Sequence, residues 1–271
     1  MFLYGVRIMK KSILLLFSMI SITACQTAPE TGRSQLLLIS ASDEVTLGYK
    51  EFTQLKRNVP VSRDHKMTAV LNKVGRRLAH VAKLKGAKWE FILFDQPQTV
   101  NAFCLPGGKV GVYSGMLPVA MNEAGLATVL AHEIAHADAR HGAERVSIGL
   151  LTKLTGEVIN ITARNQTPAV RELINSSYNI GSAVGVVLPH SREQELEADH
   201  IGLLYMARAG YPPDEAINFW QRFAQHINKN NKTPKNDFFS THPISSERIK
   251  RLRELLPLAR QEYKKSLLRK N

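Results

Sequence analysis

The segment His132-Glu133-Ile134-Ala135-His136 contains the residues of this chain that are best suited to chemistry. In an α-helix, residues four apart lie on one face, so the imidazoles of His132 and His136 can bind one divalent ion. Glu133 stands beside them and can act as a general base toward a water near that ion. Two histidines and a glutamate at this spacing are typical of zinc peptidases. The pentapeptide therefore predicts metal-assisted hydrolysis of peptide bonds.

The residues around the pentapeptide are apolar. Between Gly125 and Ala137, the two histidines and Glu133 are the only ionisable residues. A helix that is apolar nearly all round is a buried helix. Burying these polar groups is costly unless they are paired, and a metal with its water removes that cost. The alternative is two core histidines satisfied by the backbone, with Glu133 in a salt bridge elsewhere.

A catalytic zinc site needs a third protein ligand and keeps its fourth position open for water. His141 is one candidate, but it follows His132 by nine positions, about 180° around an uninterrupted helix. We therefore expect His141 to be structural.

The acidic segment from Ser191 to Asp199 is a better source of the third ligand. If it is helical, Glu195 and Asp199 share one face, and Glu193 and Glu197 share another. Spacing alone does not decide which of the two pairs supplies the third metal ligand.

Hydrophobic periodicity predicts the elements that must position these residues. Ser42 has the residue type of a helix N-cap. The segment 179–190, rich in Gly, Ser and Val, is expected to be a mobile or membrane-facing loop. The patterns predict an α+β fold, with a small sheet beside a mostly helical body. Helices are expected at roughly 43–57, 64–84, 122–152, 168–178, 191–209, 213–228 and 245–267, and strands at 89–94, 102–105 and 109–113.

The N-terminal residues have the pattern of an export signal. Three basic residues precede an apolar run from Ile13 to Ala24, which is too short for a membrane span of about 20 residues. A transmembrane anchor is the alternative. Ile22-Thr23-Ala24-Cys25 resembles the bacterial lipobox, which predicts cleavage before a lipidated Cys25. The predicted organisation is a signal peptide at 1–24, a lipidated tether and entry segment at 25–40, and a catalytic domain at 41–271.

Charge and cysteine content limit the partners and the environment. The formal net charge is +13. Residues 1–24 carry three basic and no acidic residues, so the remainder carries +10. Without a compact basic motif, this charge indicates a solvated face near anionic lipid and no nucleic-acid partner. If Cys25 is lipidated, Cys104 has no disulfide partner, and we expect it to be a buried thiol.

Several motifs together resemble one family. They include Thr31-Gly32-Arg33, Asn101-Ala102-Phe103 with Pro106-Gly107-Gly108, the pentapeptide, Glu195 to Gly202, Ala209-Gly210-Tyr211-Pro212, and Thr241-His242-Pro243. The chain resembles the gluzincin zinc metallopeptidases that include HtpX-like and type-one CaaX prenyl endopeptidases (metallopeptidase family forty-eight), in their bacterial lipoprotein branch with BepA and LoiP. The resemblance implies a gluzincin-like metalloprotease domain with one Zn²⁺ per chain and a small antiparallel or mixed sheet beside the zinc helix.

The resemblance also assigns roles. The first Glu of Glu-x-x-x-Asp is a metal ligand in that family, which implies Glu195. The Asp four residues later orients a ligand histidine, which implies that role for Asp199. Glu193 and Glu197 are then expected to face solvent.

Two further histidines each have two interpretations. His242 either starts the last helix with Pro243, or faces the zinc as an oxyanion donor or fourth ligand. His190 stands where relatives tend to carry an aromatic residue; it either approaches the metal or, as we expect, faces solvent.

The segment from Asn101 to Tyr113 also has two interpretations. It is either a core hairpin or, as the resemblance favours, an edge strand that pairs with an extended substrate backbone. The residues expected at that edge are Asn101, Lys109, Val110, Gly111 and Val112.

The predicted function is zinc-dependent endopeptidase activity on unfolded or misassembled proteins of the bacterial cell envelope, in quality control. The anchor is expected at the outer membrane, facing the periplasm, because Gln26 rather than Asp follows Cys25. One alternative is a chaperone-like assembly factor for outer-membrane proteins with a latent zinc site. Another is a structural zinc lipoprotein with four saturated ligands. The substrate sequence and the oligomeric state stay open.

Overall fold

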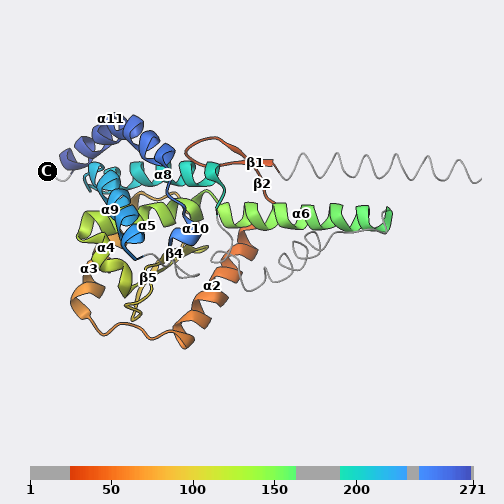
Figure 1. The fold of residues 1–271 in the computed structure, drawn as a ribbon, viewed down its shortest axis with the longest axis horizontal. Coiled ribbons are helices and arrows are strands. Elements are labelled where there is room, and N and C mark those ends of the chain that lie inside the picture. The colour runs from red at the N-terminus through yellow and green to blue at the C-terminus, as the bar shows by residue number, and fades with distance from the viewer. Residues whose placement is uncertain (1–24, 163–189, 231–237, 270–271) are drawn as a thin grey trace, which may run out of the picture.

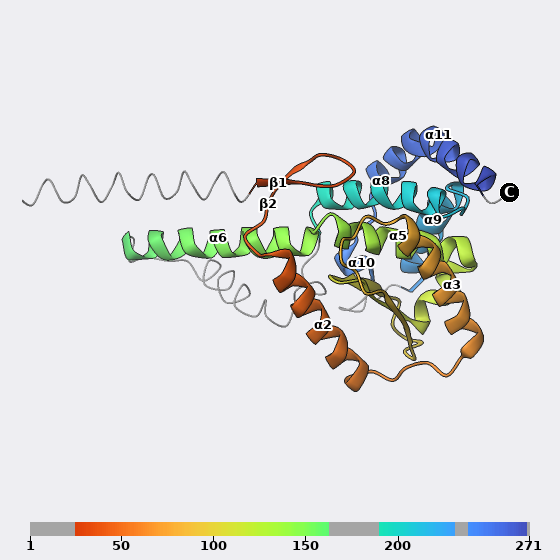
Figure 2. The same ribbon diagram turned by 180° about the vertical axis from the view of Figure 1, so that it is seen from behind.

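Helices make up most of the described part of the chain, and two small sheets lie among them (Figures 1 and 2). The computed structural model describes residues 25–162, 190–230 and 238–269. The expected α+β class is confirmed. The helices are α2 Ala41–Asn58, α3 His65–Val81, α4 Leu117–Ala120, α5 Glu123–Asp138, α6 His141–Thr162, α8 Arg192–Arg208, α9 Asp214–Asn230, α10 Phe238–Thr241 and α11 Ser246–Leu268, with the 3-10 turn η1 at Ser114–Met116.

Three sequence predictions lie outside the described residues: the signal peptide at 1–24, the helix at 168–178, and the loop at 179–189. Among the helices that the structure describes, none combines the length and the apolar character needed to cross a membrane.

The larger sheet has the strand order β3-β5-β4, with β3 at Glu90–Phe94, β4 at Ala102–Leu105 and β5 at Lys109–Tyr113. β5 pairs with β3 in parallel and with β4 in antiparallel register. Pro106-Gly107-Gly108 turns the chain between β4 and β5, and both glycines have positive φ, 82° and 78°, which a side chain disfavours.

This strand order corrects one prediction. Lys109, Val110, Gly111 and Val112 lie in β5, which is hydrogen-bonded on both sides, so they form no edge. β4 and β5 form a hairpin, and β3, which comes from earlier in the chain, pairs with the other side of β5. β4 is therefore the outer strand of this hairpin. The edge toward α5 is β4, and Asn101 immediately precedes it.

The second sheet is an N-terminal hairpin, which we define as residues 25–36. Its strands β1, Cys25–Thr27, and β2, Ser34–Leu36, are antiparallel, and Cys25 is paired with Leu36. Gly32 turns the hairpin with φ 69°. Ala28 and Gln35 are buried against the body. The segment expected to be a tether is therefore an ordered part of the fold.

Helix α5 lies at the centre of the molecule. α8 packs along one side of it, β4 lies on another, and α3 and α9 complete the surroundings (Figure 1). Every residue of α5 from Gly125 to Asp138 is buried. α11 covers the outer side of α8, and α2 approaches the end of β4. The expected buried helix is confirmed.

The single helix expected over 122–152 is in fact two. α5 ends at Asp138, Arg140 adopts φ 55°, and α6 begins at His141. The Arg140 guanidinium is held by Glu44 of α2 and by the Ile39 carbonyl, 2.8 Å away. These contacts stabilise a backbone conformation that an L-residue seldom adopts. A similar local correction applies to α2, whose N-cap is Ser40 rather than Ser42.

Candidate metal centre

Two capped helices carry the candidate ligands. The Asn122 side chain accepts a hydrogen bond from Gly125 N–H at the start of α5, at 2.8 Å. Ser191 and Gln194 form a capping box at the start of α8. Helices α5 and α8 approach each other closely at Gly202, where an added Cβ would lie 3.0 Å from the backbone nitrogen of His132. This glycine therefore lets α8 bring its carboxylates to the histidines of α5.

The two imidazoles and Glu195 converge on one point. His132 Nε2 and His136 Nε2 are 3.0 Å apart. Glu195 Oε2 lies 3.4 Å from His132 Nε2, and Glu195 Oε1 lies 3.4 Å from His136 Nε2. Two atoms that are each about 2.1 Å from a tetrahedral zinc ion lie about 3.4 Å apart, so this spacing fits one ion.

The chemistry of the donor set also fits zinc. All three side chains are at most 5% exposed. Among the described residues, neither Glu195 Oε2 nor Glu133 Oε1 receives a hydrogen bond of good geometry, although Arg248 Nη1 lies 2.7 Å from the former and His242 Nε2 lies 3.3 Å from the latter. Unsatisfied buried carboxylate oxygens are rare unless an ion or water completes them. Two imidazole nitrogens and one carboxylate form the ligand set of a catalytic zinc site.

A fourth group lies in the same cluster. His242 follows α10, and its Nδ1 lies 2.9 Å from Glu195 Oε1 and 3.3 Å from His132 Nε2. The possible ligand atoms of these four residues all lie within 4.8 Å of one another. The structure thus brings His242 to the predicted centre, where either proposed role is within reach.

Asp199 lies against the first histidine. Its Oδ1 lies 3.1 Å from His132 Nδ1, on the opposite side of the ring from the ligand atoms. Arg248 of α11 donates to both Asp199 oxygens, at 2.6 and 2.7 Å, and its Nη1 lies 2.7 Å from Glu195 Oε2. Burial raises the pKa of Asp199, but Arg248 and His132 outweigh it and lower that pKa. Asp199 is therefore ionised and able to accept a hydrogen bond from His132.

The pKa values of the three candidate ligands are shifted in different ways. Burial lowers the pKa of His132, but hydrogen bonds to Asp199 and Glu195 raise it to about 9. Burial and His190 hold the pKa of His136 well below its usual value. Burial opposes ionisation of Glu195, yet His242 and Arg248 keep its pKa well below the usual range. These shifts leave Glu195 ionised and able to hold a cation, whereas His132 would have to lose a proton to serve as a ligand.

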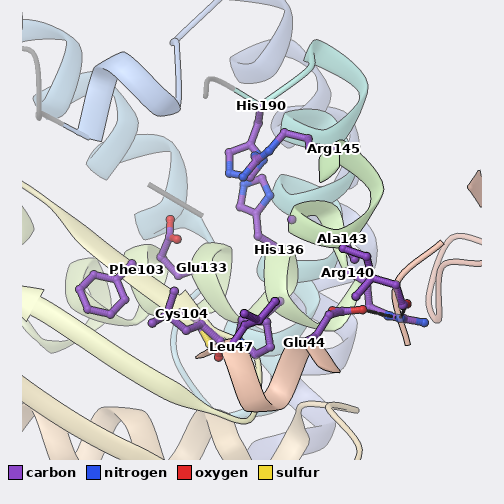
Figure 3. Close-up of a pocket in the computed structure, with 15 residues that line it drawn as sticks. Glu44, Leu47, Phe103, Cys104, Glu133, His136, Arg140, Ala143, Arg145 and His190 are labelled. Carbon is purple, nitrogen blue, oxygen red and sulfur yellow. Dashed lines mark hydrogen bonds and ion pairs between the residues drawn. The ribbon is translucent and has the colours of Figure 1, made fainter. Parts of the chain in front are cut away.

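Glu133 points into a cavity beside the ligands, above Cys104 and Phe103 of β4 (Figure 3). His136 and Arg145 line the same cavity. Burial raises the pKa of Glu133, against the lowering effect of His242 and His132. A buried carboxyl with a raised pKa next to a metal site is suited to accept and return a proton.

His190 differs from its prediction. It does not face solvent, because its exposed fraction is 9% and its ring stacks on His136 with centroids 3.8 Å apart (Figure 3). Its Nδ1 contacts the Arg145 guanidinium. Since an arginine can only donate, Nδ1 of His190 is the acceptor and carries no proton.

Glu197 differs from its prediction, and His141 differs from the argument behind its prediction but not from the prediction that it is structural. Glu197 is 6% exposed rather than solvated, and its Oε2 lies 2.9 Å from His141 Nε2. His141 Nδ1 lies 2.7 Å from His136 Nδ1. The argument that placed His141 on the far side of a continuous helix is wrong, since the chain turns at Arg140 before α6 begins. His141 nevertheless approaches His136 from the side opposite to the ligand cluster.

Sequence reasoning missed Arg248, Arg145 and Arg33, which all contact the residues of the site. No local pattern separates Arg248 from its exposed neighbours in the last helix. The one available signal was the Thr31-Gly32-Arg33 motif, which the resemblance included without a role.

Comparison with known proteins agrees with this geometry. Residues 65–256 match Peptidase family M48. Mitochondrial metalloendopeptidase OMA1 of Saccharomyces cerevisiae is 33% identical over 276 residues, covering 95% of this chain and 77% of that protein. The Schizosaccharomyces pombe protein of the same name is 38% identical over 195 residues, covering 72% of this chain and 55% of that protein.

A bacterial relative is more distant. The beta-barrel assembly-enhancing protease of Yersinia pestis is 29% identical over 227 residues, covering 82% of this chain and 45% of that protein. The chain thus spans about half the length of this relative and of the fission-yeast one. The family match covers the pentapeptide, Glu195 and His242. The chain therefore belongs to Peptidase family M48 and is a zinc metalloendopeptidase.

Proposed function

We propose that His132, His136 and Glu195 hold the zinc ion and that Glu133 is the general base. One observation carries this assignment: donor atoms from α5 and α8, buried and far apart in sequence, lie 3.0 to 3.4 Å from one another. Asp199 is proposed to fix the orientation of His132. His242 is proposed as a fourth ligand in this conformation, with donation to the oxyanion as its alternative role.

The chain's own groups account for the proton transfers. Zinc bound at these ligands supplies Lewis acidity, lowering the pKa of a water from about 15.7 to about 7 and polarising the scissile carbonyl. Glu133 accepts a proton from the attacking water and passes it to the leaving amine nitrogen. The raised pKa of Glu133 supports this role, because it brings proton acceptance and proton return closer in energy.

We propose that the substrate is an extended, unfolded polypeptide that pairs with β4. Among the described strands, none pairs with the side of β4 that faces away from β5. Tyr113 N–H donates to Asn101 carbonyl at 3.0 Å, so by the two-residue alternation of antiparallel strands the backbone groups of Ala102 and Cys104 point to that side, where the Asn101 side chain accepts from Ala102 N–H at 2.8 Å. Cys104 lines the cavity of Glu133. Main-chain pairing accepts many sequences, which suits a protease for unfolded segments.

We further propose a bacterial envelope protein anchored through lipid on Cys25, at the outer membrane and facing the periplasm. The lipobox-like Ile22-Thr23-Ala24-Cys25, the basic charge and the bacterial relative support this location. Labelled palmitate is expected to enter the wild-type chain and not Cys25→Ser. Equal labelling of both would contradict the anchor.

The direct test of the activity is zinc content together with chelator-sensitive cleavage of a denatured envelope protein. Glu133→Gln is expected to retain one zinc per chain, because Glu133 is not a ligand. Its cleavage rate is expected to fall by about 10²-fold or more, the usual loss when a general base is removed. Cleavage by this variant at the wild-type rate would show that another group activates the water.

A chaperone-like role in outer-membrane protein assembly is the second candidate, supported by the name of the bacterial relative, a beta-barrel assembly-enhancing protease. Comparing a strain that carries Glu133→Gln with a deletion strain separates the two. A shared envelope-stress phenotype indicates proteolysis, whereas a normal phenotype in the Glu133→Gln strain indicates binding alone.

A further inference from the structure

A chain of hydrogen bonds leads from the ligand His136 to the N-terminal hairpin. His136 Nδ1 lies 2.7 Å from His141 Nδ1, and His141 Nε2 lies 2.9 Å from Glu197 Oε2. Arg33 Nε donates to the same Glu197 oxygen at 2.6 Å. His141 is fully buried, and Glu197 nearly so.

With His141 neutral and Glu197 kept ionised by the Arg33 guanidinium, one arrangement of protons satisfies this chain. Arg33 and His141 both donate to Glu197, so Glu197 is ionised and His141 carries its proton on Nε2. A neutral His141 with its proton on Nε2 has a bare Nδ1, which accepts from His136 Nδ1–H. The lone pair of His136 then lies on Nε2, the atom that faces the other ligands.

The two zinc-binding histidines are thus oriented by two carboxylates of one helix. Asp199 contacts His132 directly, and Glu197 acts on His136 through His141. Outer partners of this kind fix the tautomer and the direction of a ligand imidazole.

The N-terminal hairpin supplies the outer contacts of the network that runs from His136 through His141 to Glu197. Thr31 Oγ1 also donates to Glu197, and the Arg33 guanidinium donates twice to Glu144 at 2.7 Å. Glu144 in turn accepts from Gln194 Nε2 at 2.8 Å, at the start of α8. The rest of the hairpin is fastened by Glu30, which lies 2.9 Å from Arg208 and 2.8 Å from Lys83.

We propose that His141 and Glu197 are positioning residues for His136, and that Thr31 and Arg33 make the metal affinity of the site depend on docking of the N-terminal hairpin. This inference rests on the zinc site proposed above. It couples the segment next to Cys25, the proposed anchor, to the catalytic metal. A hairpin pulled away from the body leaves Glu197 without its cation and His136 without a fixed tautomer.

The test is the rate at which the zinc-loaded full chain releases zinc to an excess of a coloured chelator. Glu197→Gln is expected to speed release about 10- to 100-fold, the usual effect of removing an outer partner of a ligand histidine. Glu193→Gln is the matched control, since it makes the same change on the same helix at an exposed position. It is expected to release zinc at the wild-type rate.

The hairpin is tested by Arg33→Ala, with Arg260→Ala as its control. Arg260 also forms an ion pair, with Asp214, but on the exposed surface of α11. Arg33→Ala is expected to speed release in the same direction as Glu197→Gln, whereas Arg260→Ala is expected to have no effect. Arg33→Lys keeps one ionic donor and is expected to restore part of the slow release.

Unchanged zinc release in Arg33→Ala and in a folded Glu197→Gln overturns the proposal, even if thermal unfolding of the metal-free protein shifts. If Glu197→Gln does not fold, Arg33→Ala and Thr31→Val decide, because both residues lie at the outer end of the network. Absence of zinc from the wild-type chain would instead overturn the metal centre itself.

Discussion

Asp199 shows at the scale of one residue how the site depends on groups that do not touch the metal. Its carboxylate lies 3.1 Å from His132 Nδ1 on one side and accepts from Arg248 on the other. The arginine is needed because a buried carboxylate without a cation would take up a proton and stop accepting. Asp199, Arg248 and His132 therefore act as one unit, and each depends on the other two.

Asp199→Asn is expected to weaken zinc binding about 10- to 100-fold, since an amide is a poorer acceptor for His132 and leaves Arg248 with a single buried carboxylate partner, Glu195. Competition with a chelator of known affinity measures the change. An affinity equal to that of the wild type would remove Asp199 from the zinc site.

Glu195 and Glu197 illustrate what the sequence could supply and what it could not. Spacing correctly placed two acidic pairs on α8, and the resemblance selected Glu195. Neither the spacing nor the resemblance revealed that Glu197 is buried. The residues that cover it and pair with it, Thr31 and Arg33, lie 166 and 164 positions away in the chain. Contacts between residues so far apart in the chain do not affect the local hydrophobic periodicity from which the helices were predicted.

At the scale of elements, the close crossing of α5 and α8 decides whether the ligands meet. The carboxylates of α8 reach the histidines of α5 only because Gly202 has no side chain at the crossing. A Cβ there would lie 3.0 Å from His132 N and 3.1 Å from the Ala131 carbonyl, so the helices would have to separate.

Gly202→Ala is expected to lower the free energy of unfolding by about 1 to 3 kcal/mol and to weaken zinc binding as well. Gly142→Ala, in the first turn of α6, is the control, because nothing lies within 4 Å of its added Cβ. It is expected to change stability by less than about 1 kcal/mol. Urea unfolding of both variants measures the difference. Equal stability of the two would contradict the close crossing.

Element prediction succeeded where the periodicity was long and failed where a single residue interrupts it. The strands at 102–105 and 109–113 and the helices α8, α9 and α11 were found within a few residues of their true bounds, whereas the short helix α10 before His242 was not predicted. The break between α5 and α6 was missed, because Arg140 adopts its positive φ through a tertiary contact with Glu44 rather than through a local glycine. The strand order was missed for a related reason, since pairing of β5 with the distant β3 is a long-range choice.

At the scale of the whole molecule, the N-terminal hairpin packs against the helices near the candidate metal centre. Figures 1 and 2 show β1 and β2 beside the N-terminal ends of α6 and α8, away from the free end of α11. Glu30 fastens the hairpin to Arg208 of α8 and to Lys83 after α3. Three elements distant in sequence thus meet at one carboxylate.

Glu30→Gln is expected to lower the unfolding free energy of the metal-free protein by about 1 kcal/mol at pH 7. Burial raises the pKa of Glu30, but Lys83 and Arg208 outweigh it and lower that pKa. Its contribution is therefore complete above its ordinary value of 4.5 and is lost as pH falls through the lowered value.

Urea unfolding of wild type and Glu30→Gln at pH 7 and in stronger acid tests this sign. The difference between the two proteins should shrink in acid, whereas Glu254→Gln, an exposed pair with Arg251, should match the wild type at both pH values. A difference that grew as pH fell would contradict the assignment.

The measurement closest to the central claim is anomalous diffraction at the zinc edge from crystals of the zinc-loaded full chain. The account predicts one zinc peak about 2.0 to 2.2 Å from His132 Nε2, His136 Nε2 and an oxygen of Glu195. A zinc peak bound elsewhere, or at the two histidines without Glu195, would contradict it.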